Sequence, residues 1–286
     1  MKRNNPYRPV EREAEKVIKD QGISKLPVNP IDLARSIGIE VKSRGYTHGV
    51  SGMLLRQGEQ YGIFYSTHIN NVGFHHFSVA HELGHYFLPG HIAAVLDGGN
   101  IHRSRAGFIS DNRYEREADH FAANILMPAL LFTSAMKKVG DGFIAVKALA
   151  DLCQTSLTAT AIRYAQCTGD SIAVVLSSGN QVDCCFMSDS LKEMEGIEWI
   201  RKGSFLPKDT ATFTFNQDKD GADHAEHVED TCNLQDWFGG SCSAEITEEI
   251  VGLGNYGKTL TVLTGFPDPE EIKEESSLMD SWQVKF

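Results

Sequence analysis

The chain has 286 residues, of which 41% are hydrophobic and 23% are charged, and its net charge is −11. This is the composition of a soluble globular protein, long enough for one large domain or two ordinary ones. No apolar run reaches the roughly 18 residues that cross a bilayer, and residues 1–6 lead into no signal-peptide core. We therefore expect a cytoplasmic protein without a membrane partner, whose six cysteines are reduced thiols.

Charge is distributed unevenly along the chain. Residues 171–286 contain 22 Asp and Glu against 8 Lys and Arg, whereas residues 1–170 contain 16 against 19. Nucleic-acid binding depends on clustered Lys and Arg side chains. The acidic C-terminal part therefore argues against broad phosphate contact, and direct DNA binding is not expected.

The N-terminal region predicts two helices and a small sheet. Apolar residues recur on one face of residues 10–21, and Asn29 with Pro30 begins a second helix that Gly38 ends. Three strands are then expected, at residues 39–41, 50–56 and 61–66. An exposed edge strand of such a sheet can hydrogen-bond an extended peptide.

A helix is predicted from about residue 72 to Pro89, and it contains His81-Glu82-Leu83-Gly84-His85. Residues four apart lie on one helix face, so the two histidines can direct imidazole nitrogens at one Zn²⁺ at about 2.0 to 2.1 Å. Glu82, one position further round, can take the proton from a water molecule beside the metal. This arrangement of residues is typical of metalloproteases.

A second helix, residues 112–127, offers the third ligand. A catalytic zinc needs three protein ligands and one open position. Glu115 and Asp119 are four apart on one face, so Glu115 can bind the metal while Asp119 accepts a hydrogen bond from a ligating histidine. Glu117 lies about 200° round from Glu115 on an ideal helix and is the alternative ligand.

His91 is a candidate for a different third ligand, because it follows His85 by six residues. This is the spacing of a three-histidine zinc site. That pattern requires a glycine three residues after the second histidine, where this chain has Leu88. His91 is therefore expected to be a loop residue, because residues 91–111 contain Gly98-Gly99-Asn100 and mixed polar residues and are predicted to be a loop.

The chain resembles the ImmA/IrrE family of metallopeptidases. The matching stretches are Leu26-Pro27-Val28-Asn29-Pro30-Ile31-Asp32-Leu33-Ala34, the ten residues from His76 to His85, and Glu115 to Pro128 ending in Ile125-Leu126-Met127-Pro128. They occur in the expected order over roughly residues 8–130.

The resemblance implies a compact thermolysin-like peptidase domain in which His81, His85 and Glu115 bind zinc and Glu82 is the general base. Members of this family cut helix-turn-helix repressors in stress responses or mobile-element control. The implied partner is therefore a protein substrate, and specifically such a repressor.

After residue 130 the pattern changes. Residues 143–153 and 157–167 are spaced like a helix-turn-helix pair, but their charges cancel, which favours a packed helical support over a DNA reader. Strands are expected at residues 172–176, 212–215 and 259–263.

The predicted fold is thus α+β, with a peptidase domain at 1–130, a helix-turn-helix-like segment at 131–168 and an acidic, β-rich domain at 169–286. We expect the last domain to sense a signal or select the substrate. His224 and His227 stand among acidic residues, but a solvated loop is the expected structure there.

Two functions follow from these features. The first is a zinc endopeptidase acting on a regulatory protein, and the alternative is a non-catalytic metal-binding regulator or DNA-associated module. Glu82 favours the first, because an idle site has no use for a base and a structural zinc has four protein ligands. The sequence leaves open the donor to a tetrahedral oxyanion, for which Tyr86 and Arg163-Tyr164 are candidates.

Overall fold

The computed structural model describes six stretches of the chain, residues 5–45, 49–97, 99–105, 111–218, 227–254 and 257–267. They form two compact units. Unit 1 is built from Met1–Val139 and Lys147–Thr160, and unit 2 from Gly140–Val146 and Ala161–Phe286. The predicted helix pair is present as α7 (Gly142–Cys153) and α8 (Leu157–Cys167), and each contributes residues to both units. The predicted boundaries at residues 130 and 168 stay predictions.

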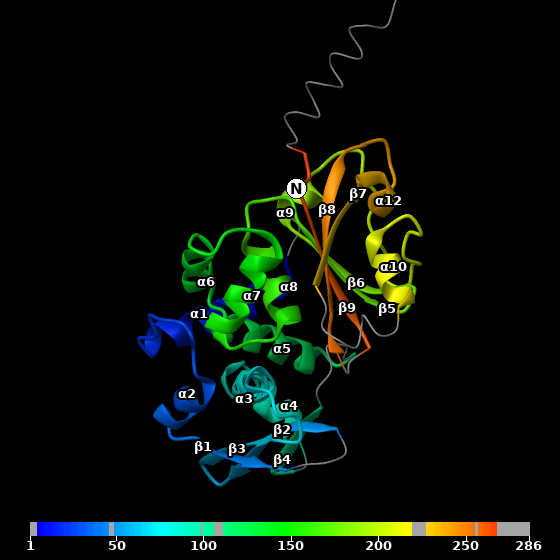
Figure 1. Ribbon diagram of the computed structural model, residues 1–286. Coiled ribbons are helices and arrows are strands. Elements are labelled where there is room, and N and C mark those ends of the chain that lie inside the picture. The colour runs from blue at the N-terminus through cyan, green and yellow to red at the C-terminus, as the bar shows by residue number, and fades with distance from the viewer. Residues whose placement is uncertain are drawn as a thin grey trace, which may run out of the picture. The chain divides into compact units, whose positions relative to one another are not determined.

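Unit 1 mixes helices with one sheet (Figure 1). Its elements in chain order are α1 (Arg8–Asp20), α2 (Pro30–Ser36), β1 (Glu40–Arg44), β2 (Val50–Gln57), β3 (Gln60–Ser66), α3 (Val72–Phe87), α4 (His91–Val95), β4 (Ile101–Arg105), α5 (Arg113–Leu126) and α6 (Ala129–Met136). The predicted helices and the three predicted strands of this region are confirmed to within a few residues.

Asparagine side chains begin three of these helices. Asn29 Oδ1 accepts hydrogen bonds from the first-turn amides of α2. Asn71 Oδ1 accepts from the amide of Phe74 in α3 at 2.9 Å, and Asn112 Oδ1 from the amide of Tyr114 in α5 at 2.9 Å. A side-chain oxygen at this position satisfies amides that have no partner within the helix. These caps fix where α3 and α5 begin, and hence which residues share each helix face.

The sheet of unit 1 has the strand order β1-β3-β2-β4. β1 runs parallel to β3, and the other neighbours are antiparallel. Between Val50 and Gly52 the pairing of β2 with β4 shifts register by one residue. The predicted loop over residues 91–111 is wrong, because this stretch contains α4 and the edge strand β4. The pairing of β4 with β2 is long-range, so it leaves little local signal in five mostly polar residues.

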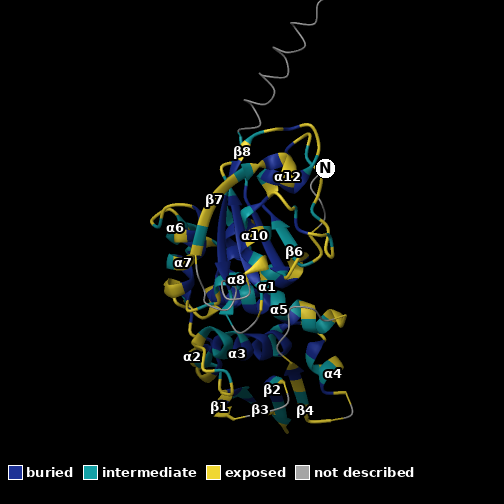
Figure 2. Cartoon of the chain, turned by 45° about the vertical axis from the view of Figure 1, so that its right-hand side comes forward, coloured by how far each residue is buried: buried dark blue, intermediate teal, exposed yellow. Residues whose placement is uncertain are grey.

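Helix α3 contacts β2, β3 and α5, and Figure 2 shows it as mostly buried. Side chains with no exposed surface fill the space between these elements, namely Leu54, Ile63, Val79, Leu83, Phe121 and Ile125. Phe121 of α5 also stacks on Phe87 of α3, with ring centroids 5.8 Å apart. Truncating a buried phenylalanine of this kind to alanine costs about 3 to 5 kcal/mol.

Gly84 allows α3 and α5 to pack closely. A Cβ atom at this position would lie 3.0 Å from Cα and 3.2 Å from Cβ of Ala118. These are shorter than ordinary van der Waals contacts, and the helix backbone of α5 cannot move aside cheaply. The glycine inside the histidine motif therefore has a packing role, since it lets the face of α5 that carries Glu115 and Asp119 approach α3.

Unit 2 contains a five-stranded antiparallel sheet with the order β6-β5-β9-β8-β7. Its elements are β5 (Ala173–Ser178), β6 (Gln181–Met187), α9 (Asp189–Lys192), α10 (Ala211–Gln217), β7 (His227–Asn233), α12 (Leu234–Phe238), β8 (Glu245–Gly252) and β9 (Thr259–Thr264). An α+β chain with a helical region and a C-terminal antiparallel sheet is thus confirmed. Strands at residues 172–176 and 259–263 were expected, whereas β6, β7 and β8 were not.

The strand predicted at residues 212–215 is wrong, because this stretch lies in helix α10. Thr210 Oγ1 accepts a hydrogen bond from the amide of Phe213 at 3.3 Å and caps the helix. The buried Glu248 carboxylate of β8 accepts hydrogen bonds from the amide and the hydroxyl of Thr212, at 2.9 and 2.7 Å. Tertiary hydrogen bonds therefore favour a helix over the strand that alternating Thr and Phe residues indicate.

Candidate metal centre

Four side chains of unit 1 converge on one point. His81 and His85 come from α3, Glu115 from the first turn of α5, and His102 from β4, and their nitrogen or oxygen atoms all lie within 4.8 Å of one another. The structure therefore brings together the three predicted ligands. Their proximity is a structural finding, whereas their individual roles stay predictions.

The distances within this cluster suit a tetrahedral zinc site. Nε2 of His81 lies 3.1 Å from Nε2 of His85 and 3.2 Å from Oε2 of Glu115. Nε2 of His85 lies 3.5 Å from Oε1 of Glu115. Ligands about 2.0 to 2.1 Å from a tetrahedral ion are separated from each other by about 3.3 to 3.4 Å, and imidazole nitrogens with a carboxylate are a donor set that Zn²⁺ prefers. The side chains present thus fit this ion.

Asp119 holds His81 in place from the other side of the ring. Oδ1 of Asp119 lies 2.8 Å from Nδ1 of His81 and accepts a hydrogen bond from it, which leaves Nε2 directed at the cluster. Burial lowers the pKa of His81, but the carboxylates of Asp119 and Glu115 outweigh burial and raise this pKa to about 10. Without a metal, His81 is therefore a cation between two carboxylates, and a divalent ion can take the place of its Nε2 proton.

His91 and Glu117 form a second chain of hydrogen bonds behind the cluster. Nδ1 of His91 lies 3.2 Å from Nδ1 of His85, and Nε2 of His91 lies 3.0 Å from Oε2 of Glu117. The Glu117 carboxylate also accepts a hydrogen bond from Arg113 at 2.7 Å. Glu117 therefore faces His91 instead of joining the four converging side chains, and His91 meets His85 on the ring nitrogen opposite Nε2. A three-histidine site that includes His91 is not what this geometry supports.

The hydrogen-bond partners of His91 and His85 determine which of their ring nitrogens carry a proton. A carboxylate only accepts, so Nε2 of His91 donates to Glu117. Burial lowers the pKa of His91, and its Nδ1 is then free of a proton and accepts from Nδ1 of His85. Burial and the neighbouring His81 lower the pKa of His85 to about 2, so His85 is neutral as well. The Nε2 lone pair of His85 therefore points at the cluster, as that of a metal ligand must.

Glu82 is fully buried beside the cluster, and its carboxylate makes no hydrogen bond of ordinary geometry with the described residues, although the Ser104 hydroxyl of β4 is near enough to favour its charged form. Gly52 of β2 makes room for it, since a Cβ atom there would lie 2.5 Å from Oε1 of Glu82. Burial raises the pKa of Glu82, and the nearby His81 offsets only part of this effect. A buried carboxylate with a raised pKa and little hydrogen bonding suits a group that takes up and releases a proton.

His102 is a member of the cluster that the sequence patterns did not predict. Its Nε2 atom lies 3.3 Å from Oε1 of Glu115, and its ring lies edge-on to that of His85 with centroids 4.6 Å apart. The isolated residue carries no motif, and the stretch around it was expected to be a loop. If residues 101–105 are treated as a strand, the period of two places His102 and Ser104 on one face, but this stretch was not predicted to be one.

Tyr86, a candidate donor to an oxyanion, packs elsewhere. Its ring lies against those of Tyr61 and Phe87, at centroid distances of 5.1 and 5.2 Å, and belongs to the hydrophobic core of unit 1. The ring of His120 stacks on Tyr7 at 3.5 Å. Both residues therefore have packing contacts outside the cluster.

Comparison with known proteins decides the family. Residues 34–163 match the model of the Peptidase_M78 family, described as the IrrE N-terminal-like domain. This stretch includes all of the converging side chains. Residues 34–163 therefore form a domain of the ImmA/IrrE type. The resemblance inferred from its motifs is confirmed, and the family is one of metallopeptidases.

One solved structure extends the comparison beyond the ImmA/IrrE domain. It is described as a Mycobacterium tuberculosis transcriptional regulator, is 12% identical with a TM-score of 0.58, and the match covers 90% of this chain and 76% of that one. At this level of identity the similarity shows the fold alone. No curated protein was found to match the chain.

Among the described residues, the cysteines form no second cluster of metal-binding side chains. All six cysteines are free thiols. Burial raises the pKa of Cys153 and of Cys185 to about 12, which makes them poor nucleophiles. His227 is exposed at the start of β7 and stacks on Phe143 at 4.7 Å, while His224 lies outside the described residues.

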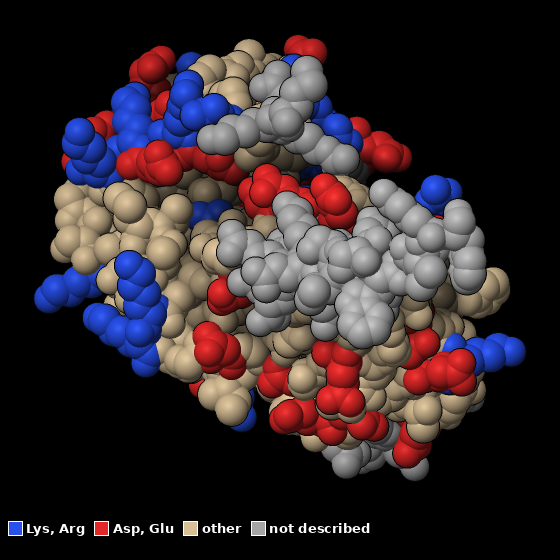
Figure 3. All heavy atoms as spheres, turned by 90° about the horizontal axis from the view of Figure 1, so that it is seen from above, with Lys and Arg blue, Asp and Glu red and all other residues tan. Residues whose placement is uncertain are grey.

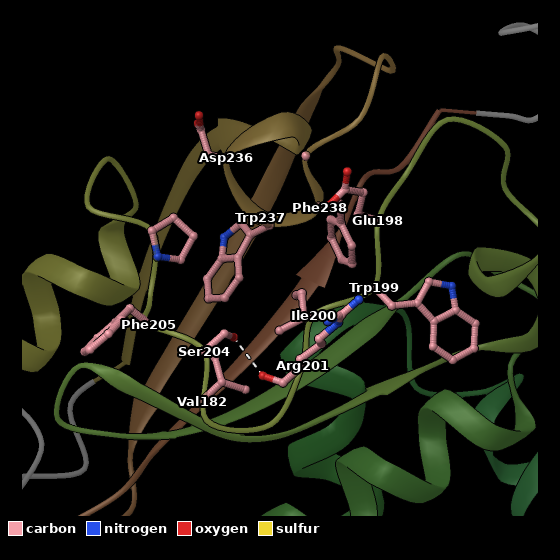
Figure 4. A pocket seen from close by; sticks show the side chains of 12 residues that line it. Val182, Glu198, Trp199, Ile200, Arg201, Ser204, Phe205, Asp236, Trp237 and Phe238 are labelled. Atoms are coloured by element: carbon pink, nitrogen blue, oxygen red, sulfur yellow. Dashed lines mark hydrogen bonds between the residues drawn. The ribbon is translucent and has the colours of Figure 1, made fainter.

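Unit 2 has a cavity of about 820 Å³, in the size range of small-molecule sites. None of its lining residues belongs to the metal cluster. Figure 4 shows the side chains of Trp237 and Phe238 next to Ile200 and Arg201, with Phe205 at one end of the cavity and Trp199 at the other. The walls thus combine aromatic surface with one guanidinium group. No described helix, in either unit, is both long and apolar enough to span a membrane.

Proposed function

We propose that this protein is a zinc-dependent endopeptidase of the cytosol that cleaves a regulatory protein, specifically a helix-turn-helix transcriptional repressor, in a stress response or in mobile-element control. The observation that carries the proposal is the position of Glu82. This carboxylate is fully buried, and it stands beside two imidazoles and a second carboxylate at separations that suit zinc.

In the proposed reaction, His81, His85 and Glu115 hold the ion, and Glu82 handles the proton. A zinc ion bound there would polarise the scissile carbonyl group and lower the pKa of a water molecule. Glu82 takes the proton from the attacking water and passes it to the leaving amine. Its raised pKa supports this role, because a buried carboxylate binds the proton more firmly than an exposed one and can still release it.

The edge strand β4 supports a peptide substrate. Among the described strands, β4 pairs only with β2, so its outer edge offers backbone amides and carbonyls to another chain. An extended peptide bound there would run as an added strand past His102, whose ring is in the cluster. The proposed substrate segment is therefore extended and carries the bond to be cut close to Glu82.

Charge supports a protein partner over direct contact with nucleic acid. The C-terminal 116 residues contain 22 acidic and only 8 basic residues. On the face shown in Figure 3, the Lys and Arg atoms at the upper left lie next to Asp and Glu atoms, and Asp and Glu atoms predominate at the lower right. Phosphate contacts need clusters of cations. We propose that unit 2 senses a signal or selects the substrate, and the cavity beside Trp237 and Arg201 is the feature that supports this.

The function is tested with purified, zinc-loaded protein and candidate helix-turn-helix regulators, with cleavage read by mass spectrometry. Wild type is expected to cut one regulator at a defined bond. Glu82→Gln should bind the same amount of zinc and cut at least about 100-fold more slowly, the lower end of what a general base contributes. Glu59→Gln is the charge-matched control, because Glu59 is an exposed turn residue and should leave the rate unchanged.

Equal cleavage by wild type and Glu82→Gln would remove Glu82 as the base. Zinc binding without cleavage of any regulator would favour the alternative, a metal-binding regulator with no catalysis. The metal content of each variant separates these results from simple loss of the ion.

A further inference from the structure

His102 is placed as a ligand would be placed. Its Nε2 atom lies 3.3 Å from Oε1 of Glu115, which is about the separation of two ligands on one tetrahedral zinc ion. All four groups, His81, His85, His102 and Glu115, lie within 4.8 Å of one another. The side chain of His102 is only 15% exposed, so it is directed into the cluster and away from solvent.

Four protein ligands have a specific chemical meaning. Catalytic zinc sites keep three protein ligands and one open position, whereas a fourth protein ligand closes the ion to water and substrate. Glu82 has no use in a permanently closed structural site, yet the fold buries its carboxylate beside the cluster and makes room for it at Gly52. A fourth protein ligand that can dissociate from the ion accounts for both the four converging side chains and the buried Glu82.

We propose that His102 is a fourth protein ligand of the metal, and that it holds the peptidase in a latent state until it leaves the ion. This inference rests on the proposed peptidase function. The coordination position that His102 would occupy is the one that water and substrate need for the reaction. The peptidase would therefore become active when His102 dissociates from the ion.

His102 is also the ligand that can leave most readily. His81 is held by Asp119 at 2.8 Å, and His85 by His91 at 3.2 Å, both on the rigid helix α3. His102 lies on the edge strand β4, where the Ser104 hydroxyl is 3.2 Å from its Nε2 atom. When His102 leaves the ion, the Ser104 hydroxyl can donate to Nε2 and receive the ring.

The experiment counts histidine ligands in the full-length, zinc-loaded protein by X-ray absorption spectroscopy. Wild type should show three imidazole ligands. The His102→Ala and His102→Gln variants should each show two. His68→Ala is the matched control and should show three, because His68 hydrogen-bonds Ser66 at 2.7 Å outside the cluster. Zinc affinity should fall at least about tenfold in both His102 variants, the smallest effect typical even of groups that only support a ligand. At saturating zinc, both variants should cut the substrate severalfold faster than wild type.

Two imidazole ligands in the wild type would overturn the assignment. If the number of imidazole ligands falls from three to two in the His102 variants but cleavage becomes slower, latency is overturned. Slower cleavage with an unchanged number of imidazole ligands would also overturn it, because that result marks a histidine that contacts the reacting carbonyl group. If no protein cuts any regulator while the count falls from three to two, the ligand assignment stands and the proposed peptidase function fails. Thermal unfolding of both His102 variants and of His68→Ala identifies any variant that has not folded.

Discussion

Nδ1 of His91 lies 3.2 Å from Nδ1 of His85, so the second histidine of the motif is held from behind by a third histidine that does not join the cluster. His91 in turn donates to Glu117. The two histidines of α3 are therefore oriented in two different ways, His81 directly by a carboxylate and His85 through an intervening imidazole.

Removing the hydrogen bonds that link His85, His91 and Glu117 should weaken metal binding. His91→Phe and Glu117→Gln are each expected to lower zinc affinity about 10- to 100-fold, because the groups that orient a ligand typically contribute that much. Competition with a chromogenic chelator measures the affinity. Glu13→Gln is the control, since Glu13 makes only an exposed ion pair with Lys16 at 3.5 Å. Unchanged affinity in the Glu117 variant would show that His85 does not depend on His91 for its tautomer.

Metal binding should release a proton. The pKa of His81 is raised to about 10 by Asp119 and Glu115, so His81 is charged at pH 7 in the metal-free protein and must lose its Nε2 proton to bind the ion. Because protons compete for the same nitrogen, apparent zinc affinity should fall about tenfold for each unit by which pH is lowered below neutrality. Calorimetry in two buffers of different ionisation enthalpy counts the protons. A count near zero would contradict the assigned charge of His81.

Gly84→Ala should separate the helices that carry the site. The added Cβ would press on Ala118 at 3.0 to 3.2 Å, and overpacking of this kind costs about 1 to 3 kcal/mol. The expected result is lower stability of unit 1 together with weaker zinc binding. Gly62→Ala is the control, because its Cβ would meet its nearest neighbour, the Glu40 carbonyl, at an ordinary 3.6 Å. Chemical denaturation of the metal-free protein, followed by circular dichroism, compares the two variants.

Gly52→Ala should affect the rate more than the metal. The new Cβ would collide with Oε1 of Glu82 at 2.5 Å and displace the carboxylate. Misplacing a catalytic group by about 1 Å can cost about 100-fold in rate. Zinc content should stay at the wild-type level, since the atoms nearest to this Cβ all belong to Glu82 and not to a predicted ligand. A variant that cuts its substrate at the wild-type rate would contradict the proposed position of Glu82.

Unit 2 allows a separate test of pH-dependent stability. Burial raises the pKa of Asp183, but hydrogen bonds from Lys258 at 2.6 Å and Ser178 at 2.7 Å outweigh burial and lower it below 3.8. A carboxylate with a lowered folded pKa stabilises the protein above its unfolded pKa, and this contribution disappears as pH falls through the folded value. Lys258→Met should therefore cost about 0.5 to 1 kcal/mol at pH 7, discounted for partial exposure of the pair, and less below pH 4.

Tryptophan fluorescence during urea unfolding measures this effect, because all three tryptophans lie after residue 198 and report on the C-terminal part of the chain. Lys192→Met is a suitable control, since Lys192 pairs with the largely exposed Asp189. The same loss at pH 3 and pH 7 would show that the ion pair does not carry the difference.

Sequence patterns were most informative where the signal is local. Asn71 and Asn112 mark the starts of α3 and α5 because a capping side chain acts within three residues of its own position. The spacing of Glu115 and Asp119 predicts that both face the cluster, because residues four apart share one face of a helix. These features need no information about distant parts of the chain.

The predictions that were wrong or missing concern features that depend on contacts between distant parts of the sequence. Helix α10 was expected to be a strand because its Thr and Phe residues alternate, but Glu248, far along the chain, binds the amide of Thr212. His102 was missed because β4 exists through its pairing with β2, about 50 residues earlier. The pocket for Glu82 depends on Gly52 in the same way, since the approach of a strand to a helix is a tertiary contact.

The register of β4 against β2 has a consequence for which side chain reaches the cluster. Successive residues of a strand face opposite sides of the sheet, so His102 and Ser104 face the cluster while Arg103 faces away. A change that moved β4 by one residue along β2 would exchange these faces. An arginine would then stand where the imidazole is now, and a fixed positive charge would oppose any divalent cation. The chemistry of this site is thus encoded partly in a strand pairing that lies outside the histidine motif.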